Sequence, residues 1–298
     1  MRIKLFTAAL LCVFLSNAQD VKIVRHEQLL KGIESQCYNP VLSPDGQKVL
    51  FTQSDYEGLK VYDIKNDVTK ELATDRMAGF FPAFSKDGKS VYFLSQTREN
   101  MLVYRSMKKV NLDGTGMETV VEKSRGMSYP VVVDGGVAAI SDSGRKLKAK
   151  SDGGTYVYSN GKEIVVVKNG VEKKITPVPT KYTYLWVSLS PDGTKILFYA
   201  GAKGAYICDL DGAVIADLGK YISPAWCGND YVVAVNATHD GHQYETSQVV
   251  LLKADGSYKK ELTTPVSMSM HPTASASGDR ITYNTIDGRL FLMELKIK

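Results

Sequence analysis

The sequence predicts an all-β protein, a six-bladed β-propeller of four-stranded antiparallel blades, and two repeated features support this prediction. A polar turn recurs along the 298-residue chain, each time before a run of apolar β-forming residues. A second hairpin turn, usually Asp-Gly or Asn-Gly, lies between successive copies. The composition, 44% hydrophobic and 23% charged, is that of a chain with a folded core and excludes disordered, collagen-like and polytopic membrane proteins.

The first 18 residues are predicted to be a signal peptide rather than part of the fold. Arg2 and Lys4 form a basic start, residues 5–15 are an apolar run, and Ser16 and Ala18 place small side chains before a cleavage site. The run is shorter than the roughly 20 residues that cross a bilayer. We therefore expect export to the periplasm or the medium without membrane insertion, with residues 19–298 as a single propeller domain. A retained amphipathic helix is the alternative.

The charge balance indicates no nucleic-acid partner. Without Arg2 and Lys4, the 37 basic and 32 acidic residues become 35 and 32, a formal +3. Basic and acidic side chains alternate along the predicted strands, as on a solvated outer face. The three remaining cysteines, Cys37, Cys208 and Cys227, are irregularly spaced, so buried thiols are expected, although an oxidising compartment permits one disulfide.

Six copies of the polar turn define the inner part of each blade. The clearest copies lie at residues 43–46, 85–88 and 190–193, where Ser-Pro-Asp-Gly or Ser-Lys-Asp-Gly precedes an apolar strand. Proline presets φ, and glycine accepts the positive φ that reverses the chain. Weaker copies follow Tyr129-Pro130, Ser223-Pro224 and His271-Pro272. Taking positions 45, 87, 135, 192, 229 and 277 as equivalent gives spacings of 42, 48, 57, 37 and 48 residues, hence six units.

The second hairpin gives each unit its outer strands. Its turns lie at residues 65–67, 113–114, 169–170, 211–212 and 255–256, and Asn-Gly and Asp-Gly favour the type I′ turn of a hairpin. The last unit has three strands and no fourth. Residues 21–30 are expected to supply this strand, which closes the ring. The alternative is a solenoid or two β-sandwiches. A β-sandwich, however, does not require a sequence repeat of this period.

These repeats resemble the TolB-type, WD-like β-propeller repeat. The resemblance rests on the Ser-x-Asp-Gly turn, the apolar strand after it, and an Asp-Gly hairpin before an outer strand ending in Leu-Thr, as at Glu261-Leu262-Thr263. It covers residues 21–298, although the third unit is degenerate around residues 141–160, which are interpreted as an insertion. The resemblance implies a six-bladed ring in an exported bacterial protein that serves as a binding platform. It does not specify an activity.

The residues just before the inner strands are expected to surround the mouth of the ring. These six mouth residues are Asn39, Phe81, Tyr129, Trp186, Ser223 and His271. Five precede a proline, which tolerates the first position of a strand because its missing N–H is not needed there. The loops leading into the inner strands are expected to add Arg76, Arg125, Tyr182, Tyr184, Tyr221 and Met270. Alternatively, these side chains only plug the top of the channel.

A metal site is a second possibility at the same rim. The loop from His239 to His242 is expected to approach His271, and three histidines with Gln243 suit Mn or Zn. The arrangement resembles the His and Gln site of propeller-type oligogalacturonate lyases, which resemble a larger ring. Because His-x-x-His on a loop lacks the fixed geometry of a helix, two solvent-exposed histidines are the alternative.

The leading hypothesis is an exported, monomeric, non-enzymatic propeller without a cofactor, which binds an envelope protein, a peptide or a glycan through its mouth. Aromatic rings with a few Arg and His donors suit such ligands. The rival is a metal-assisted polysaccharide lyase or hydrolase on His239, His242 and His271. The sequence contains no Gly-x-Ser-x-Gly elbow and no phosphate-binding glycine loop, and its Asp-Gly pairs lack the ligand pattern of a calcium loop.

Overall fold

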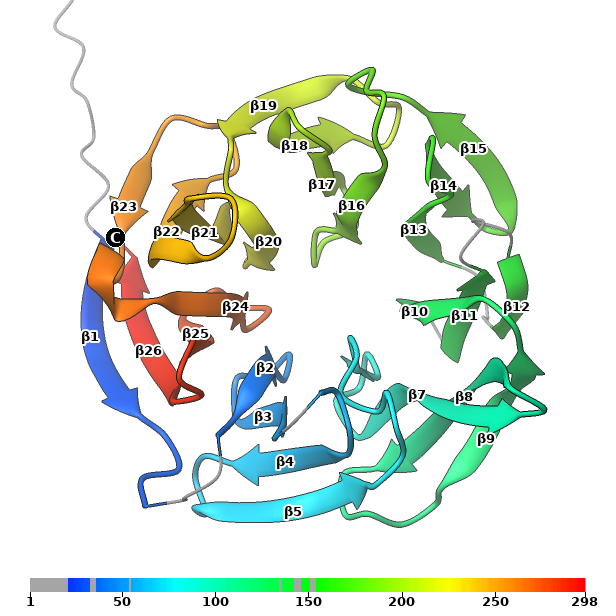
Figure 1. Ribbon diagram of the computed structural model, residues 1–298. Coiled ribbons are helices and arrows are strands. Elements are labelled where there is room, and N and C mark those ends of the chain that lie inside the picture. Colours follow the sequence, from blue (N-terminus) through cyan, green and yellow to red (C-terminus); the bar gives the residue numbers. More distant parts are fainter. Residues whose placement is uncertain are drawn as a thin grey trace, which may run out of the picture.

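Seven antiparallel sheets surround a common axis in the computed structural model of the protein (Figure 1). The structure describes residues 21–32, 36–53, 55–133, 136–141, 146–150 and 154–297, and for residues 146–150 only the backbone is considered. The predicted signal peptide lies outside these residues. Each sheet stands with one strand toward the axis and one at the perimeter, which is the arrangement of a β-propeller.

The blades are numbered by the order of their inner strands in the chain. Blade 1 contains β2 (Tyr38–Leu42), β3 (Lys48–Thr52), β4 (Leu59–Asp63) and β5 (Val68–Ala73). Blade 2 contains β6 (Ala83–Phe84), β7 (Ser90–Glu99), β8 (Leu102–Asn111) and β9 (Glu118–Ser124). Blade 3 contains β10 (Met127–Val133), β11 (Gly136–Ser141) and β12 (Lys146–Lys150), and blade 4 contains β13 (Thr155–Ser159), β14 (Ile164–Lys168) and β15 (Val171–Ile175).

The remaining three blades each have four strands. Blade 5 contains β16 (Tyr184–Leu189), β17 (Lys195–Ala200), β18 (Gly204–Asp209) and β19 (Val214–Gly219). Blade 6 contains β20 (Ile222–Cys227), β21 (Tyr231–His239), β22 (Tyr244–Lys253) and β23 (Lys259–Glu261). A short 3-10 helix, η1 (Pro265–Ser267), leads to blade 7, which contains β24 (Ser269–Ala274), β25 (Arg280–Thr285), β26 (Leu290–Ile297) and, at its outer edge, β1 (Val21–Gln28).

The all-β propeller and its closure by the N-terminal strand are confirmed, and the blade count is corrected. Where the sequence predicts one degenerate third blade with an insertion, the described residues form two three-stranded sheets, so the ring has seven blades rather than six. The reason lies in β13 and β14, which are apolar on both faces. Tyr156, Tyr158 and Val165 pack against blade 3. Val157, Ile164 and Val166 pack against blade 5. A sheet covered on both faces is a blade of its own.

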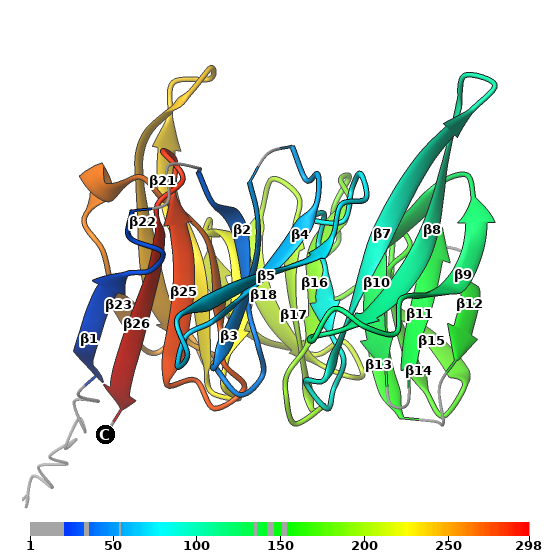
Figure 2. The ribbon, with the colours of Figure 1, turned by 90° about the horizontal axis from the view of Figure 1, so that it is seen from below.

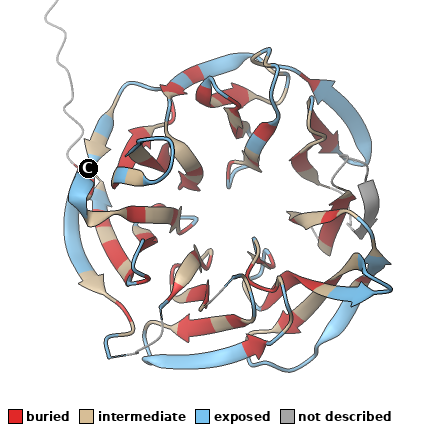
Figure 3. Cartoon of the chain, viewed as in Figure 1, coloured by how far each residue is buried: buried red, intermediate tan, exposed pale blue. Residues whose placement is uncertain are grey.

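One hydrophobic cluster fills each of the seven interfaces between neighbouring blades. The cluster between blades 7 and 1, for example, joins Leu290 and Leu292 of β26 to Val49 and Phe51 of β3. The outer strands are exposed by comparison (Figure 3), as β15 shows with Val171 72% exposed. The three cysteines are buried as thiols, as predicted. Burial raises the pKa of Cys208 to about 12, which makes that thiol unreactive.

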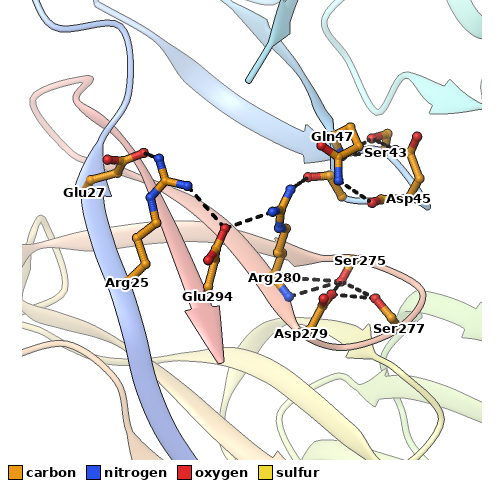
Figure 4. A network of polar contacts seen from close by, with 11 residues as sticks. Arg25, Glu27, Ser43, Asp45, Gln47, Ser275, Ser277, Asp279, Arg280 and Glu294 are labelled. Carbon is orange, nitrogen blue, oxygen red and sulfur yellow. Dashed lines mark hydrogen bonds and ion pairs between the residues drawn. The ribbon is translucent and has the colours of Figure 1, made fainter. Parts of the chain in front are cut away.

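The N-terminal strand closes the ring through backbone and side-chain contacts. β1 pairs antiparallel with β26 from Val21, opposite Ile297, to Gln28, opposite Phe291. A polar network extends the closure to blade 1 (Figure 4). The Glu294 carboxylate binds Arg25 of β1 at 3.3 Å and Arg280 of β25 at 2.9 Å. Arg280 also donates to the carbonyl of Gly46 in the first turn of blade 1, at 3.0 Å. The two ends of the chain are thereby fixed to each other and to the first blade.

The predicted turn has a more specific chemistry than the sequence indicates. In blade 1, the Ser43 hydroxyl donates to the Asp45 carboxylate at 2.5 Å and accepts the N–H of Lys48 at 2.9 Å. Ser85 of blade 2 and Ser190 of blade 5 make the same pair of contacts. Ser275 of blade 7 accepts the N–H of Arg280 in the same way but donates to Asp279, four residues on. Because these serines are almost fully buried, their hydroxyls need both partners, which explains why this residue recurs.

Two hairpins extend beyond the body of the ring on the same face (Figure 2). They are β7–β8 of blade 2 and β21–β22 of blade 6, and they stand on different sides of the axis. In each blade, the chain alternates between the two faces of the ring, so the loops that lead into the inner strands open on this face as well. Within the described residues, no helix has the length and hydrophobicity needed to span a membrane.

Candidate functional site at the mouth of the ring

A β-bulge interrupts the inner strand of five blades near its start. In blade 1, Tyr38 pairs with Thr52 and Val41 with Leu50, so two residues of β2 lie opposite one residue of β3. The register shifts in the same way in β16, β20 and β24, and one position earlier in β10. A bulge of this kind turns side chains away from the regular alternation of the strand.

The first residue of the bulge is left-handed in blades 1, 5, 6 and 7, and so is Phe81, which lies just before β6 of blade 2. None of these five residues is glycine. The φ angles are 52° at Asn39, 49° at Phe81, 49° at Trp186, 50° at Ser223 and 50° at His271. These are five of the six predicted mouth residues. The sixth, Tyr129, has no positive φ, in line with its shifted bulge. A left-handed conformation costs an L-residue about 1–2 kcal/mol, so its recurrence reflects a constraint of the repeat.

Proline is common at these bulges but does not produce the positive φ by itself, because Trp186 has the same conformation before Val187. Pro40, Pro224 and Pro272 occupy the second position of their bulges. The sheet requires no N–H donor at this position, so proline is tolerated there. The ring of a proline also disfavours the right-handed helical region for the residue before it. These prolines are predicted at the first position of a strand but lie inside it, at the bulge.

The mouth residues of blades 2, 3 and 5 are aromatic and are held by ring contacts. Phe81 packs against Tyr129 of the next blade, with ring centroids 5.4 Å apart, and edge-to-face against Phe80 at 4.9 Å. Tyr56 extends the cluster through Phe80, at 5.2 Å. Phe81 is nevertheless 47% exposed, and burial raises the pKa of Tyr129. In blade 5, Trp186 lies edge-to-face on Tyr199 at 5.4 Å. We call these residues the aromatic half of the mouth.

The mouth residues of blades 6, 7 and 1 are polar: Ser223, His271 and Asn39. His271 Nδ1 lies 3.3 Å from the Asn284 amide oxygen, and the Asn284 amide nitrogen donates to the Thr285 carbonyl at 2.9 Å. Since that oxygen only accepts, Nδ1 donates, and the neutral ring presents Nε2 as an acceptor. Burial lowers the pKa of His271. We call these residues the polar half of the mouth.

The loops leading into the inner strands contribute some of the expected residues and not others. Arg76, Arg125 and Tyr182 are exposed, and Tyr221 is half-buried. Tyr184 is a correction, because it is 1% exposed and its hydroxyl donates to the Val178 carbonyl at 2.7 Å. As the first residue of β16, before the bulge, it faces the core between blades 4 and 5. Its side chain is therefore structural.

The expected histidine cluster is not formed. Among the described residues, no three His, Cys, Asp or Glu side chains lie close enough together to hold a metal ion. The loop from His239 to His242 is organised by Asp240, whose carboxylate accepts the N–H groups of His242 at 2.7 Å and Gln243 at 2.8 Å. These donors lower the pKa of Asp240. His239 Nδ1 accepts the N–H of Gly241, which leaves this nitrogen occupied within the loop. The residues present do not fit a three-histidine site.

Sequence reasoning does not identify the residues that support the mouth. Tyr56 and Phe80 complete the aromatic cluster of blade 2, and Tyr199 supports Trp186. Phe80 adjoins a predicted mouth residue and Tyr199 ends an apolar strand, so neither stands out by pattern. Tyr56 comes from the loop between β3 and β4, and only the fold brings it to Phe80.

Comparison with solved structures places this architecture among known propellers. TolB from Agrobacterium tumefaciens superposes with a TM-score of 0.54 and 17% identity over 89% of this chain and 91% of that one. The fold is a TolB-like β-propeller. The β-propeller domain of Myceliophteria thermophila Cps50 (Swd1) gives a TM-score of 0.58 at 9% identity, over 92% of this chain and 99% of that one.

Enzymes occur among the structural neighbours of this TolB-like propeller as well. The tricorn protease gives a TM-score of 0.55 at 15% identity, but this chain covers 88% of its own length and only 26% of that protein. An oligogalacturonate lyase in complex with manganese gives a TM-score of 0.50 at 10% identity, over 88% of this chain and 78% of that one. At these identities the likeness concerns the fold alone. No family model and no curated protein sequence matches the chain.

Proposed function

We propose that this protein is an exported, non-enzymatic binding propeller that engages an envelope protein, a peptide or a glycan through the mouth of its ring. The observation that carries the proposal is the recurrence of a left-handed, non-glycine residue at the same point of five blades. Where a backbone conformation serves only a turn, glycine removes the strain. Here the five positions carry Asn, Phe, Trp, Ser and His, so each of them offers a side chain to a ligand where glycine would offer none.

The chemistry of the mouth supports a ligand with both apolar and polar groups. The aromatic half offers exposed ring surface, and the polar half offers hydroxyl, amide and imidazole groups. A peptide, a protein loop and a sugar each combine such groups. Arg76 and Arg125 add positive charge at the edge of the aromatic half. We further propose that the protein acts as a monomer in the periplasm or the medium, without nucleic acid and without membrane insertion.

A pull-down from envelope extract tests this function. The rim variant combines Tyr129→Ala, Trp186→Ala and His271→Ala. The matched control combines Val68→Ala, Val171→Ala and Val214→Ala, three exposed apolar residues of outer strands. We expect the wild type and the control to recover the same partner and the rim variant to lose it. Equal recovery by all three proteins would exclude the mouth as the binding surface.

A further inference from the structure

An amide oxygen is buried without a hydrogen-bond partner between blades 5 and 6. Gln248 of β22 is 4% exposed, and its Oε1 atom is buried without a hydrogen bond from any described residue. A buried acceptor that forms no hydrogen bond destabilises the folded state, because it has lost its bonds to water. Its neighbours on the same face of β22, Val250 and Leu252, are apolar and fill this interface without such a cost.

A second amide lies beside it. Asn236 of β21 is the cross-strand partner of Gln248 and is half-buried. Both side chains lie on the sheet face that carries Ala234 and Val250, and this face packs against blade 5. Because β20 begins opposite Val235, Asn236 lies one residue beyond the inner strand, at the level of the mouth. The two amides therefore point into the space between two blades at the rim.

Blade 5 presents aromatic side chains to the same interface. Tyr199 of β17 and Tyr221, which precedes β20, pack against the cluster that contains Ala234 and Val250. Trp186 of the mouth lies edge-to-face on Tyr199. Tyr221 lies between β19 and β20 and is half-buried, so part of its surface is open to solvent. None of the five side chains in this group carries a charge at neutral pH.

We infer that Gln248 and Asn236, together with Trp186, Tyr199 and Tyr221, form a binding subsite for a neutral glycan. This inference rests on the proposed function and names its ligand class. A primary amide donates and accepts, as do the neighbouring hydroxyls of a sugar, so one amide satisfies two hydroxyls at once. Aromatic rings cover the C–H face of a sugar. The absence of charge among these side chains favours a neutral sugar over a uronate or a phosphorylated ligand.

Calorimetry with defined oligosaccharides tests the subsite on the full chain. The neutral probes are maltohexaose, cellohexaose and N-acetylchitohexaose, and oligogalacturonate is the charged comparison. Gln248→Met preserves volume and removes the amide. We expect at least one neutral probe to bind, and Gln248→Met to weaken it tenfold or more while the Tm is unchanged or higher, because an unmade acceptor has been removed. Gln96→Met, on β7 of blade 2, is the control and should bind as the wild type.

Three results would overturn the subsite. They are the absence of binding by every neutral probe, wild-type affinity in Gln248→Met, and tighter binding of oligogalacturonate than of the neutral probes. If Gln248→Met does not fold, Asn236→Ala takes its place and must also weaken binding. The pull-down separates the two proposals. A partner that is lost in the rim variant but retained in Gln248→Met, with no sugar bound, would leave the binding function standing and refute the glycan subsite.

Discussion

The two halves of the mouth share one backbone design and differ in what holds their side chains. In the aromatic half, Phe81 and Trp186 are fixed by ring contacts and keep exposed surface. In the polar half, His271 is fixed by a hydrogen bond to Asn284, a buried residue. The same left-handed backbone thus presents apolar surface at Phe81 and Trp186 and a directed polar group at His271. The repeat therefore fixes the position of each mouth residue, whereas the residue type fixes its chemistry.

The largest expected effect comes from truncating the aromatic half. Phe81→Ala should weaken binding of the recovered partner by tenfold or more, because aromatic anchors dominate interface energetics. Asn39→Ala, the equivalent change in the polar half, should weaken it only a few-fold. Surface plasmon resonance with the partner from the pull-down measures both. A larger loss for Asn39→Ala than for Phe81→Ala would reverse the assigned roles of the two halves.

The left-handed backbone predicts an effect on stability at a single serine. Ser223→Gly removes the strain at φ 50°, whereas Ser128→Gly changes a bulge residue of β10 that has no positive φ. Both substitutions add the same flexibility to the unfolded chain. Ser223→Gly should therefore give a free energy of unfolding about 1–2 kcal/mol higher than Ser128→Gly. Urea denaturation measures the difference, and equal stabilities would show that the left-handed backbone carries no strain.

Two histidines, His271 in the polar half of the mouth and His26 on β1, should make the stability of the fold depend on pH. Burial lowers the pKa of His271 and of His26, which lies on β1 with Nε2 2.8 Å from the Tyr283 hydroxyl. The unfolded chain therefore takes up these protons first as the pH falls. Stability is full above the unfolded pKa of about 6.5 and should decrease below it, by at most about 1.4 kcal/mol per pH unit for each group.

Urea denaturation at pH 7.5, 6.5 and 5.5 measures this loss. The double variant His26→Gln with His271→Asn should show a flatter profile over the same range. The carboxylates with lowered pKa values contribute only at lower pH, near the unfolded pKa of about 4. A wild-type stability that stays constant or rises between pH 7.5 and 5.5 would contradict the burial of these two rings in neutral form.

The smallest expected effect is that of metal removal. Because the described residues bring no three metal-binding side chains together, treatment with EDTA should leave both the Tm and the recovery of the partner unchanged. Differential scanning fluorimetry and metal analysis of the purified protein measure this. Stoichiometric Mn, Zn or Fe, lost together with His239 or His242, would restore the lyase hypothesis.

The fold could be predicted where the sequence repeats its turn chemistry. The Ser-x-Asp-Gly turns mark the blades because a buried serine hydroxyl needs both the carboxylate and the amide that the turn provides. The closure by residues 21–28 followed from a last unit with one strand missing. Blade 4 is not predicted as a separate blade because it lacks this turn. Its signal is the uninterrupted apolar run from Ile164 to Val167, which a sheet buried on both faces requires.

The X-Pro pairs near the inner strands are visible in the sequence, but their backbone conformation is not. X-Pro pairs located Asn39, Phe81, Ser223 and His271, since a proline near the start of a strand is visible in the sequence. The bulge is not visible in the sequence, because it depends on how the inner strand pairs with the next strand. Tyr184 was misplaced for the same reason, since its orientation follows from its pairing with Ala200. The amides of Asn236 and Gln248 meet only through the β21–β22 register.

Photo-crosslinking tests most directly whether the mouth is the binding surface. A photoreactive amino acid at Tyr182, 62% exposed beside the mouth, is compared with one at Val171, 72% exposed on an outer strand. In envelope extract, we predict a discrete crosslinked product from position 182 and none from position 171, with the product lost when Phe81→Ala is added. The same product from both positions, or a product from position 171 alone, would contradict the account.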